Sequence, residues 1–381
     1  MLYLVLPLGN DYGWGVCGNY LTKRLAKWTS VRLFTNPFGP EHVGGELDYL
    51  FLKDLCLDQE AFLAEVAGMA DPVIQGIRDH SLVPVEPRAR GRFNIGYTFF
   101  ERSVLAREDV DNARQAFDVI VAGSTWCENV LRTHGLHNTC TIIQGVDRAL
   151  FNPCGNDKSI LRDRFVVFSG GKFEFRKGQD LVIRAFKVLQ DRHEDVLLVA
   201  AWYNPWNFSL QTMSISPHIT FKFEGEEYRS AMEKLITING IDGRKVVVLP
   251  PKPNATMAAV YKNTDCGIFP NRCEGGTNLV LMEYMACGKP AIVSNSSGHR
   301  DVAHEKNSCL LKNLKPVNIT EGNRLVAVWD EPDLDEIVDR MEWAYQNRGA
   351  LDDLGRAAAQ SMETLTWDSA ARQFYRLAHC M

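Results

Sequence analysis

The stretch FPNRCEGGTNLVLMEYMACGKPAIVS, residues 269–294, organises the second half of the chain. A short apolar run precedes it, and Pro270, Glu274 and the pair Gly275-Gly276 mark a loop before a helical pattern that begins near residues 277–278. The expected order is strand, glycine loop, helix, strand. Because the first backbone N–H groups of a helix are unpaired and carry partial positive charge, such a loop favours an anion, most simply a phosphate.

Two acidic residues flank this expected phosphate site. Glu274 precedes the glycine pair, and Glu283 lies about two helical turns into the helix. A carboxylate next to a phosphate is repelled by it, so neutral hydroxyl groups are the better partners for both acids. A phosphate together with hydroxyl groups indicates a sugar nucleotide.

Length and composition describe a globular protein of two domains. The 381 residues exceed one ordinary core, and 45% hydrophobic with 23% charged residues is typical of folded proteins. The net charge of −5 argues against nucleic acid as a partner.

Cysteine usage and hydropathy bear on the compartment. The ten cysteines contain no CxxC pair and no zinc spacing, as in a reduced cytosolic protein. The opening MLYLVLPL lacks a basic leader and fits a buried strand better than a signal segment. No apolar run approaches membrane-spanning length. We expect a cytoplasmic protein, with peripheral contact at the inner membrane face left open.

Alternating strand and helix patterns in both halves predict an α/β protein with two doubly wound, Rossmann-like sheets. The run LFNPCGNDKS, residues 150–159, resembles an interdomain connection. We therefore expect domains over residues 1–153 and 154–365, with a C-terminal helix over residues 366–381 that packs back on the first. Residues 58–69 and 71–79 show helical patterns. Two such sheets place a ligand in the cleft between them.

The first domain carries a literal GxGxxG motif, GWGVCG at residues 13–18, in an expected loop that precedes a helix from residue 19. It begins several residues after the strand, and Thr35, Asn36 and Pro37 stand where a ribose-binding acid would close the next strand. Both features disfavour a nicotinamide cofactor. What remains is that the backbone near Gly15 turns sharply or approaches a ligand.

A second glycine loop opens the second domain, with the sequence SGGKFEFRKG at residues 169–178. Lys172 and Lys177 stand where point charges could reach a diphosphate, although a solvated loop is the alternative. The pairs Asp109/Asp111 and Asp333/Asp335 lie in or at expected helices, so we interpret them as solvated faces and caps. No metal is required by these patterns.

Together these motifs resemble the GT-B glycosyltransferases of family 4, a large retaining class that uses nucleotide sugars. The resemblance is best across GGKFEFRKGQDLVIRAF and FPNRCEGGTNLVLMEYMACGKPAIVSNSSG, and it reaches into the first domain through FDVIVAGSTWCENVLRTHGL and TIIQGVDRALFNP. It implies a GT-B fold with a cleft between the domains. It also implies that a nucleotide sugar is the donor and that no cofactor is needed.

The resemblance assigns roles to residues by position. Lys172 and Lys177 would contact the donor diphosphate, Glu274 the transferred sugar and Glu283 the ribose. The family usually has arginine at the position of Lys172. A lysine there loses the bidentate hydrogen bonding that a guanidinium can make to a phosphate. On the acceptor side we expect Glu101, and near the sugar Gly15. Further donor contacts are expected at Gly171, Gly275, Gly276, Thr277, Asn278 and Leu279.

The spacing of the two glutamates is a second departure. Eight residues separate Glu274 from Glu283, where the family usually has seven. The extra residue falls in the turn over residues 275–278, so we expect a wider loop with Glu283 in its usual place.

The resulting prediction is a retaining, metal-independent hexosyltransferase that uses a UDP- or GDP-linked sugar and a glycan or lipid-linked sugar acceptor. The alternative is a non-catalytic relative that binds a nucleotide sugar or glycan. A helix over residues 19–28 mixes apolar and basic residues. Core packing explains it better than membrane contact, which a lipid-linked acceptor would favour.

Overall fold

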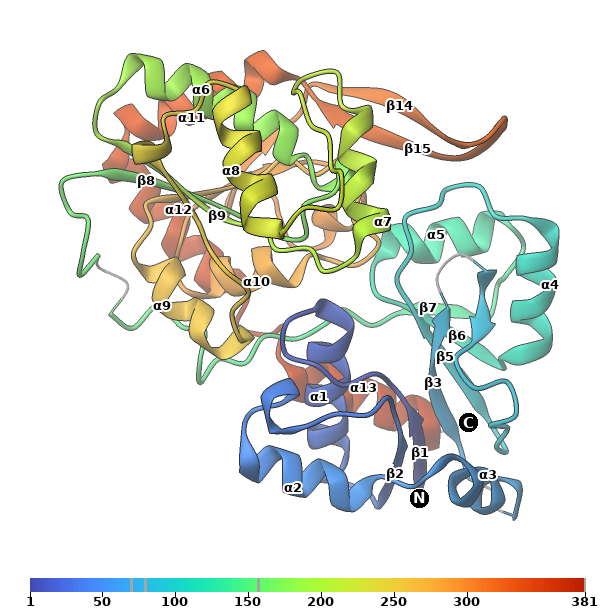
Figure 1. The fold of residues 1–381 in the computed structure, drawn as a ribbon. Coiled ribbons are helices and arrows are strands. Elements are labelled where there is room, and N and C mark those ends of the chain that lie inside the picture. Colours follow the sequence, from blue (N-terminus) through green and yellow to red (C-terminus); the bar gives the residue numbers. More distant parts are fainter. Residues whose placement is uncertain (69–70, 79–80, 156–157, 380–381) are drawn as a thin grey trace.

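The computed structural model describes residues 1–68, 71–78, 81–155 and 158–379. They form two α/β units that face each other (Figure 1). The first sheet runs in the order β2-β1-β3-β5-β6-β7, and all pairs along it are parallel, while β4 pairs antiparallel with β3. Its strands are β1 (Leu2–Val5), β2 (Val31–Phe34), β3 (Val73–Arg78), β4 (Val83–Pro84), β5 (Asn94–Thr98), β6 (Val119–Ala122) and β7 (Thr139–Thr141). Its helices are α1 (Gly13–Leu25), α2 (Glu46–Leu55), α3 (Gln59–Gly68), α4 (Arg107–Ala116) and α5 (Thr125–Thr133).

The second sheet is parallel throughout and runs in the order β10-β9-β8-β11-β12-β13. Its strands are β8 (Phe165–Gly170), β9 (Val196–Ala201), β10 (Val246–Val248), β11 (Cys266–Phe269), β12 (Ala291–Ser294) and β13 (Cys309–Leu311). Its helices are α6 (Gln179–Arg192), α7 (Asn207–Leu210), α8 (Tyr228–Ile238), α9 (Met257–Lys262), α10 (Leu279–Ala286), α11 (Leu334–Gln346) and α12 (Arg348–Ser361). A separate hairpin, β14 (Leu314–Glu321) with β15 (Arg324–Pro332), follows β13. The predicted pair of doubly wound sheets is confirmed.

The central strands read as continuous apolar runs because helices cover both faces of each sheet. Every residue of β8, β11 and β12 is buried. Polar loop residues follow the carboxyl ends of β8 and β11, and parallel strands bring such ends to one edge of the sheet. This edge carries the site.

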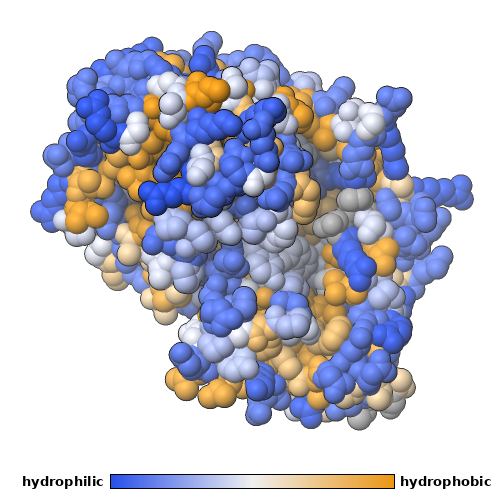
Figure 2. Space-filling view, in the orientation of Figure 1, coloured by the Kyte–Doolittle hydropathy of each residue, from blue (hydrophilic) through white to orange (hydrophobic). Residues whose placement is uncertain are grey.

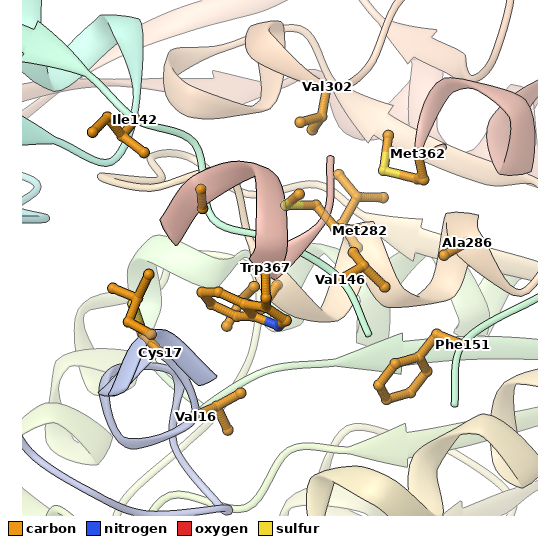
Figure 3. Packing of buried hydrophobic residues seen from close by; sticks show 14 of the residues in the cluster. Val16, Cys17, Ile142, Val146, Phe151, Met282, Ala286, Val302, Met362 and Trp367 are labelled. Carbon is orange, nitrogen blue, oxygen red and sulfur yellow. The ribbon is translucent and has the colours of Figure 1, made fainter. Parts of the chain in front are cut away.

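The last helix, α13 (Trp367–His379), packs on α1 of the first unit. Trp367 is buried and stacks on Tyr20 with ring centroids 5.2 Å apart. The same apolar cluster continues through Val16 of α1 and Met282 of α10, so it spans both units (Figure 3). Residues 380 and 381 of the predicted helix lie outside the described part of the chain.

Two predicted boundaries are wrong. Residues 73–78 of the expected helix form strand β3, and residue 79 lies outside the described residues. The helix of the first glycine motif begins at Gly13 and not at residue 19, so the three glycines lie within its first turns.

Helix α1 has no free apolar face in this fold. Leu21 and Leu25 are buried, and Lys23 pairs with Asp48 at 2.6 Å. The mixed pattern of residues 19–28 thus reflects core packing with a solvated side. In the described ranges, we find no helix with the length and apolar character that crossing a bilayer requires.

Candidate active site

A cleft of ≈ 860 Å³ lies between the two units. Figure 2 shows the hollow in the surface that separates the upper and lower parts of the molecule. The first unit contributes residues of the loop before and into α1 and the segment after β5. The second unit contributes the loops after β8, β9, β10 and β11, together with the hairpin. Both sheets thus present the ends of their strands to one space.

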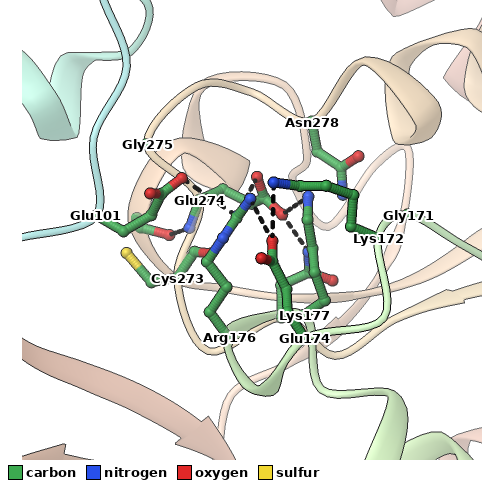
Figure 4. A network of polar contacts seen from close by, with 12 residues as sticks. Glu101, Gly171, Lys172, Glu174, Arg176, Lys177, Cys273, Glu274, Gly275 and Asn278 are labelled. Atoms are coloured by element: carbon green, nitrogen blue, oxygen red, sulfur yellow. Dashed lines mark hydrogen bonds and ion pairs between the residues drawn. The ribbon is translucent and has the colours of Figure 1, made fainter. Parts of the chain in front are cut away.

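Glu274 lies in this cleft in the loop after β11. Its side chain is buried, and Oε1 lies 2.5 Å from Nζ of Lys177 while Oε2 lies 3.2 Å from Nη1 of Arg176 (Figure 4). Asn271 also donates to Oε1. Burial raises the pKa of Glu274, but the charges of Lys177 and Arg176 outweigh burial and hold it at about 2. The carboxylate is therefore ionised across the physiological range.

Arg176 is the residue that sequence reasoning passed over. It is surrounded by three carboxylates, with Nη2 2.8 Å from Glu174 and Nη1 3.3 Å from Glu101 in addition to Glu274. Burial lowers its pKa, but these acids together raise it above the ordinary value. The sequence signal for it was that two cationic residues, Arg176 and Lys177, directly precede Gly178. Gly178 adopts φ 72°. That left-handed residue ends the turn that points Arg176 and Lys177 into the cleft.

Lys172 lies at the edge of this cluster. Its Nζ lies 4.8 Å from the centroid of the Trp206 ring and 3.6 Å from Glu174. It is partly exposed and lines the cleft. The site has a guanidinium group although position 172 is a lysine, because Arg176 supplies one beside Glu274.

The start of α10 also lines the cleft. Asn278 is the residue before the helix, and it holds φ 64°, which is unusual for a residue other than glycine. Its Oδ1 accepts from the N–H of Leu281 at 3.4 Å, and its Nδ2 lies 3.2 Å from Nε2 of His299. Burial lowers the pKa of His299 to about 4, so the imidazole is neutral and can accept this hydrogen bond.

The glycine pair has two different surroundings. Gly276 lines the cleft with Asn278 and Leu279. Gly275 instead packs on the first unit, where a Cβ would lie 2.4 Å from the carbonyl oxygen of Phe100. Its own carbonyl accepts from Oγ of Ser124 at 2.6 Å.

Thr277 is buried beside Met282 and is not among the residues that line the cleft. Of the four residues in this wide turn, Gly276 and Asn278 face the space where a ligand would lie.

Glu283 projects from α10 into the cleft despite the longer turn. Its Oε1 accepts from Nδ2 of Asn254 at 2.6 Å, and the hydroxyl of Tyr261 lies 3.5 Å from Oε2. Burial without a cation raises its pKa to about 8. The two glutamates thus have opposite electrostatic environments.

The remaining predicted residues lie around the rim. Glu101 is 30% exposed and lines the cleft beside Arg176, and Gly171 lines it after β8 with φ 116°. Gly15 does not line it, because a Cβ there would lie 2.5 Å from the Cα of Gly9. Its neighbours Gly13 and Trp14 face the cleft instead. Over the described residues, no group of three or more His, Cys, Asp or Glu side chains is arranged to hold a metal ion.

Comparison with protein families decides the assignment. The family model described as glycosyl transferases group 1 matches residues 156–361, which include both loops that carry the charged cluster. The chain belongs to this family.

Individual relatives are distant. The D-inositol 3-phosphate glycosyltransferase 1 of Catenulispora acidiphila is 29% identical over 249 residues, which is 62% of this chain and 53% of that protein. The chain spans about half the length of the curated relatives it matches.

Two solved structures align with this chain over its whole length. Anabaena HepE in complex with UDP and glucose superposes with a TM-score of 0.66 at 16% identity, covering 100% of this chain and 99% of that one. A trehalose-6-phosphate synthase, studied for enzymatic glycosyltransfer with retention, gives a TM-score of 0.64 at 12% identity, covering 100% and 99%. These likenesses establish the GT-B type of fold.

Proposed function

We propose that this protein is a retaining glycosyltransferase of the family 4 type, which moves a hexosyl group from a UDP- or GDP-linked sugar to a glycan or glycolipid acceptor. The observation that carries the proposal is Glu274, a buried carboxylate held ionised by Lys177 and Arg176 in the cleft between the units. Membership of the glycosyl transferases group 1 family supports it.

The donor would lie along the second unit. Lys177 and Arg176 would attract the diphosphate, assisted by the free backbone N–H groups at the start of α10. Glu274 would then exchange part of its cationic contact for a hydroxyl group of the transferred sugar. Glu283 and Asn254 lie further along α10 and the loop after β10, where they would meet the ribose. The charges of Arg176, Lys177 and Glu274 are thus in place before the donor arrives.

For the chemical step we propose that the acceptor attacks the anomeric carbon from the same face as the one from which the leaving group departs. The acceptor oxygen forms a bond to the anomeric carbon as the bond from that carbon to the diphosphate oxygen breaks. The acceptor proton passes to the departing phosphate. The protein positions both partners and stabilises the leaving diphosphate. The trehalose-6-phosphate synthase, a fold relative studied for transfer with retention, supports this choice.

Other parts of the proposal rest on the same comparisons. Binding of UDP by HepE and the name of the inositol phosphate relative support a nucleotide sugar and a hydroxylated sugar-like acceptor. We propose no cofactor or metal beyond the donor. The nine described cysteines are free, which supports a reducing, cytoplasmic location.

A donor panel with a matched variant tests the proposal. Hydrolysis and transfer are measured with UDP-glucose, UDP-galactose, UDP-N-acetylglucosamine and GDP-mannose, for wild type and Glu274→Gln. We expect wild-type turnover of at least one donor and a loss of about 10²–10³ in kcat in the variant. Glu305→Gln, at an exposed pair with Lys312, serves as the control and is expected to match wild type.

The outcomes separate the two hypotheses. Equal activity of Glu274→Gln and wild type would contradict the site. Donor binding by wild type without hydrolysis or transfer would instead support the non-catalytic alternative.

A further inference from the structure

The β14–β15 hairpin belongs to neither sheet and extends from the second unit over the first (Figure 1). Its strands pair antiparallel from Leu314 opposite Pro332 to Glu321 opposite Arg324. An isolated two-stranded ribbon is marginally stable in water, so other contacts must hold it. Those contacts lie at its base and along its outer half.

The outer half is bound to one short segment of the first unit. The N–H of Val104 donates to the carbonyl of Val326 at 3.1 Å, and the N–H of Val328 donates to Oγ of Ser103 at 2.8 Å. Arg102 pairs with Glu321 of the hairpin. These partners directly follow Glu101, so the hairpin holds the segment that presents this acid to the cleft.

Trp329 makes the contact nearest to the site. Its Nε1–H donates to the carbonyl of Glu101 at 2.7 Å, and its ring centroid lies 6.4 Å from that of Phe175. Phe175 is adjacent to Arg176, whose guanidinium meets the carboxylate of Glu101. Trp329 therefore contacts the backbone of Glu101 on one side of the Glu101–Arg176 pair, and Phe175, the neighbour of Arg176, on the other.

The base of the hairpin is fixed by a buried ionic cluster. Arg272, with no exposed surface, lies 2.6 Å from Glu331 and 2.7 Å from Asp180, and its guanidinium covers the Phe175 ring at 3.8 Å. Arg272 is two residues before Glu274. The hairpin and the proposed site thus share one support, which limits their relative movement.

The outer part of the hairpin lines the cleft on the side of Glu101. It offers the half-buried apolar side chain of Ile319 and the exposed hydroxyl of Thr320, a mixture that suits the ring face and hydroxyl groups of a saccharide. The proposed donor contacts come from the loops after β8, β10 and β11 instead. The side of Glu101 is therefore the place left for an acceptor.

We propose that the β14–β15 hairpin forms the acceptor wall of the cleft, and that Trp329 is a positioning residue that holds Glu101 toward a saccharide hydroxyl. The inference rests on the proposed function and deepens it. A wall here also keeps water from the anomeric carbon when the donor is bound. Losing the wall should favour hydrolysis over transfer.

A shortened hairpin tests this wall. Residues 319–327 are replaced by Asn-Gly, a turn suited to joining the paired residues Asn318 and Val328, so that Trp329 and the Glu331 contact remain. Donors are those of the panel above, and acceptors are p-nitrophenyl glycosides and inositol 3-phosphate. We expect UDP or GDP affinity within about twofold of wild type. We expect the rate of donor hydrolysis to rise, and the ratio of transfer to hydrolysis to fall at least about tenfold.

Point variants refine the test with the hairpin left at its natural length. Ile319→Ala shortens a side chain that lines the cleft. Val328→Ala shortens a similar side chain that is exposed and does not line the cleft. Trp329→Phe keeps an aromatic ring, although a smaller one, and removes the indole N–H. We expect Ile319→Ala and Trp329→Phe to raise the acceptor KM with the donor KM and Tm unchanged, and Val328→Ala to behave as wild type.

Each result has one meaning. Unchanged hydrolysis and transfer in the shortened variant, or an equal loss of both together with nucleotide affinity, would overturn the acceptor wall while leaving the proposed function intact. A wild type that neither hydrolyses nor transfers any donor would overturn both.

Discussion

At the residue scale, the positive charge of the site is concentrated on two of its three cations. Arg176 and Lys177 meet Glu274 directly, while Lys172 lies at the rim over Trp206. We predict that Arg176→Ala lowers kcat/KM by about 10²-fold or more, because a donor to the leaving diphosphate is lost. Lys172→Ala should cost no more than about tenfold, since solvent screens a partly exposed charge. Steady-state kinetics on both variants checks the order, and a larger loss for Lys172→Ala would reverse the assignment.

Glu283 gives a prediction about pH. Its carboxyl has a pKa of about 8 against an ordinary 4.5, so it carries a proton at neutral pH in the free protein. Ribose hydroxyl groups that donate to it favour the ionised form and lower this pKa on binding. Nucleotide binding should therefore release a proton, and affinity should rise as pH increases from 6 toward 8, by up to about tenfold per unit.

Calorimetric titration with UDP and GDP in two buffers of different ionisation enthalpy measures that proton. Glu283→Gln cannot ionise and should bind with little pH dependence. The same observed enthalpy in both buffers for wild type would show that Glu283 keeps its proton.

These residues also show how far sequence reasoning reaches. Glu274 and Glu283 could be found because a glycine loop before a helix restricts the local backbone. Lys172 and Lys177 were selected from the sequence and Arg176 was left out, because the choice depends on how a short turn of three residues, Phe175–Lys177, points successive side chains. The position of Glu101 depends on contacts with the hairpin more than two hundred residues away in the chain.

At the scale of elements, strands that are buried on both faces could be predicted from their continuous apolar runs. The strands that were not predicted were missed for physical reasons. Strand β3 contains Gln75, which is fully buried and satisfied by the carbonyl of Ala89 and the N–H of Glu86. A buried polar residue with partners elsewhere hides a strand from pattern analysis. The hairpin was missed for a related reason, because much of its surface is exposed and its stability comes from contacts with the first unit and with Arg272 of the second.

Helix α13 carries a stability prediction. Trp367 fills the core between α13 and α1, where it stacks on Tyr20. We predict that Trp367→Ala lowers the free energy of unfolding by about 3–5 kcal/mol, because a large cavity forms where neighbours cannot collapse. Chemical denaturation measures the loss. Leu47→Ala, at an 83% exposed position on α2, is the control and should change stability by no more than about 0.5 kcal/mol. A loss as small as that of the control would mean that α13 docks only loosely.

At the scale of the whole molecule, the site exists only when the two units meet. Ser124 of the first unit bonds the carbonyl of Gly275, Thr125 bonds Asp301, and the hairpin binds residues 101–104. The nucleotide contacts proposed above belong to the second unit alone. Binding of the nucleotide and turnover of the sugar should therefore respond differently to a change at the interface.

Gly275 allows that difference to be measured. A methyl group at this position would lie 2.4 Å from the carbonyl oxygen and 2.7 Å from the nitrogen of Phe100. Because these are backbone atoms, no flexible side chain can move aside. Gly275→Ala should hold the units apart, lowering kcat by about 10–100-fold while UDP or GDP affinity stays within about twofold. Gly349→Ala is the control, because nothing lies within 4 Å of its Cβ position and helix α12 tolerates alanine. Kinetics, calorimetry and small-angle scattering on the two variants separate the cases. If Gly275→Ala turned over donor at the wild-type rate, catalysis would not need this closed contact, and the cleft would have to assemble in another arrangement of the units.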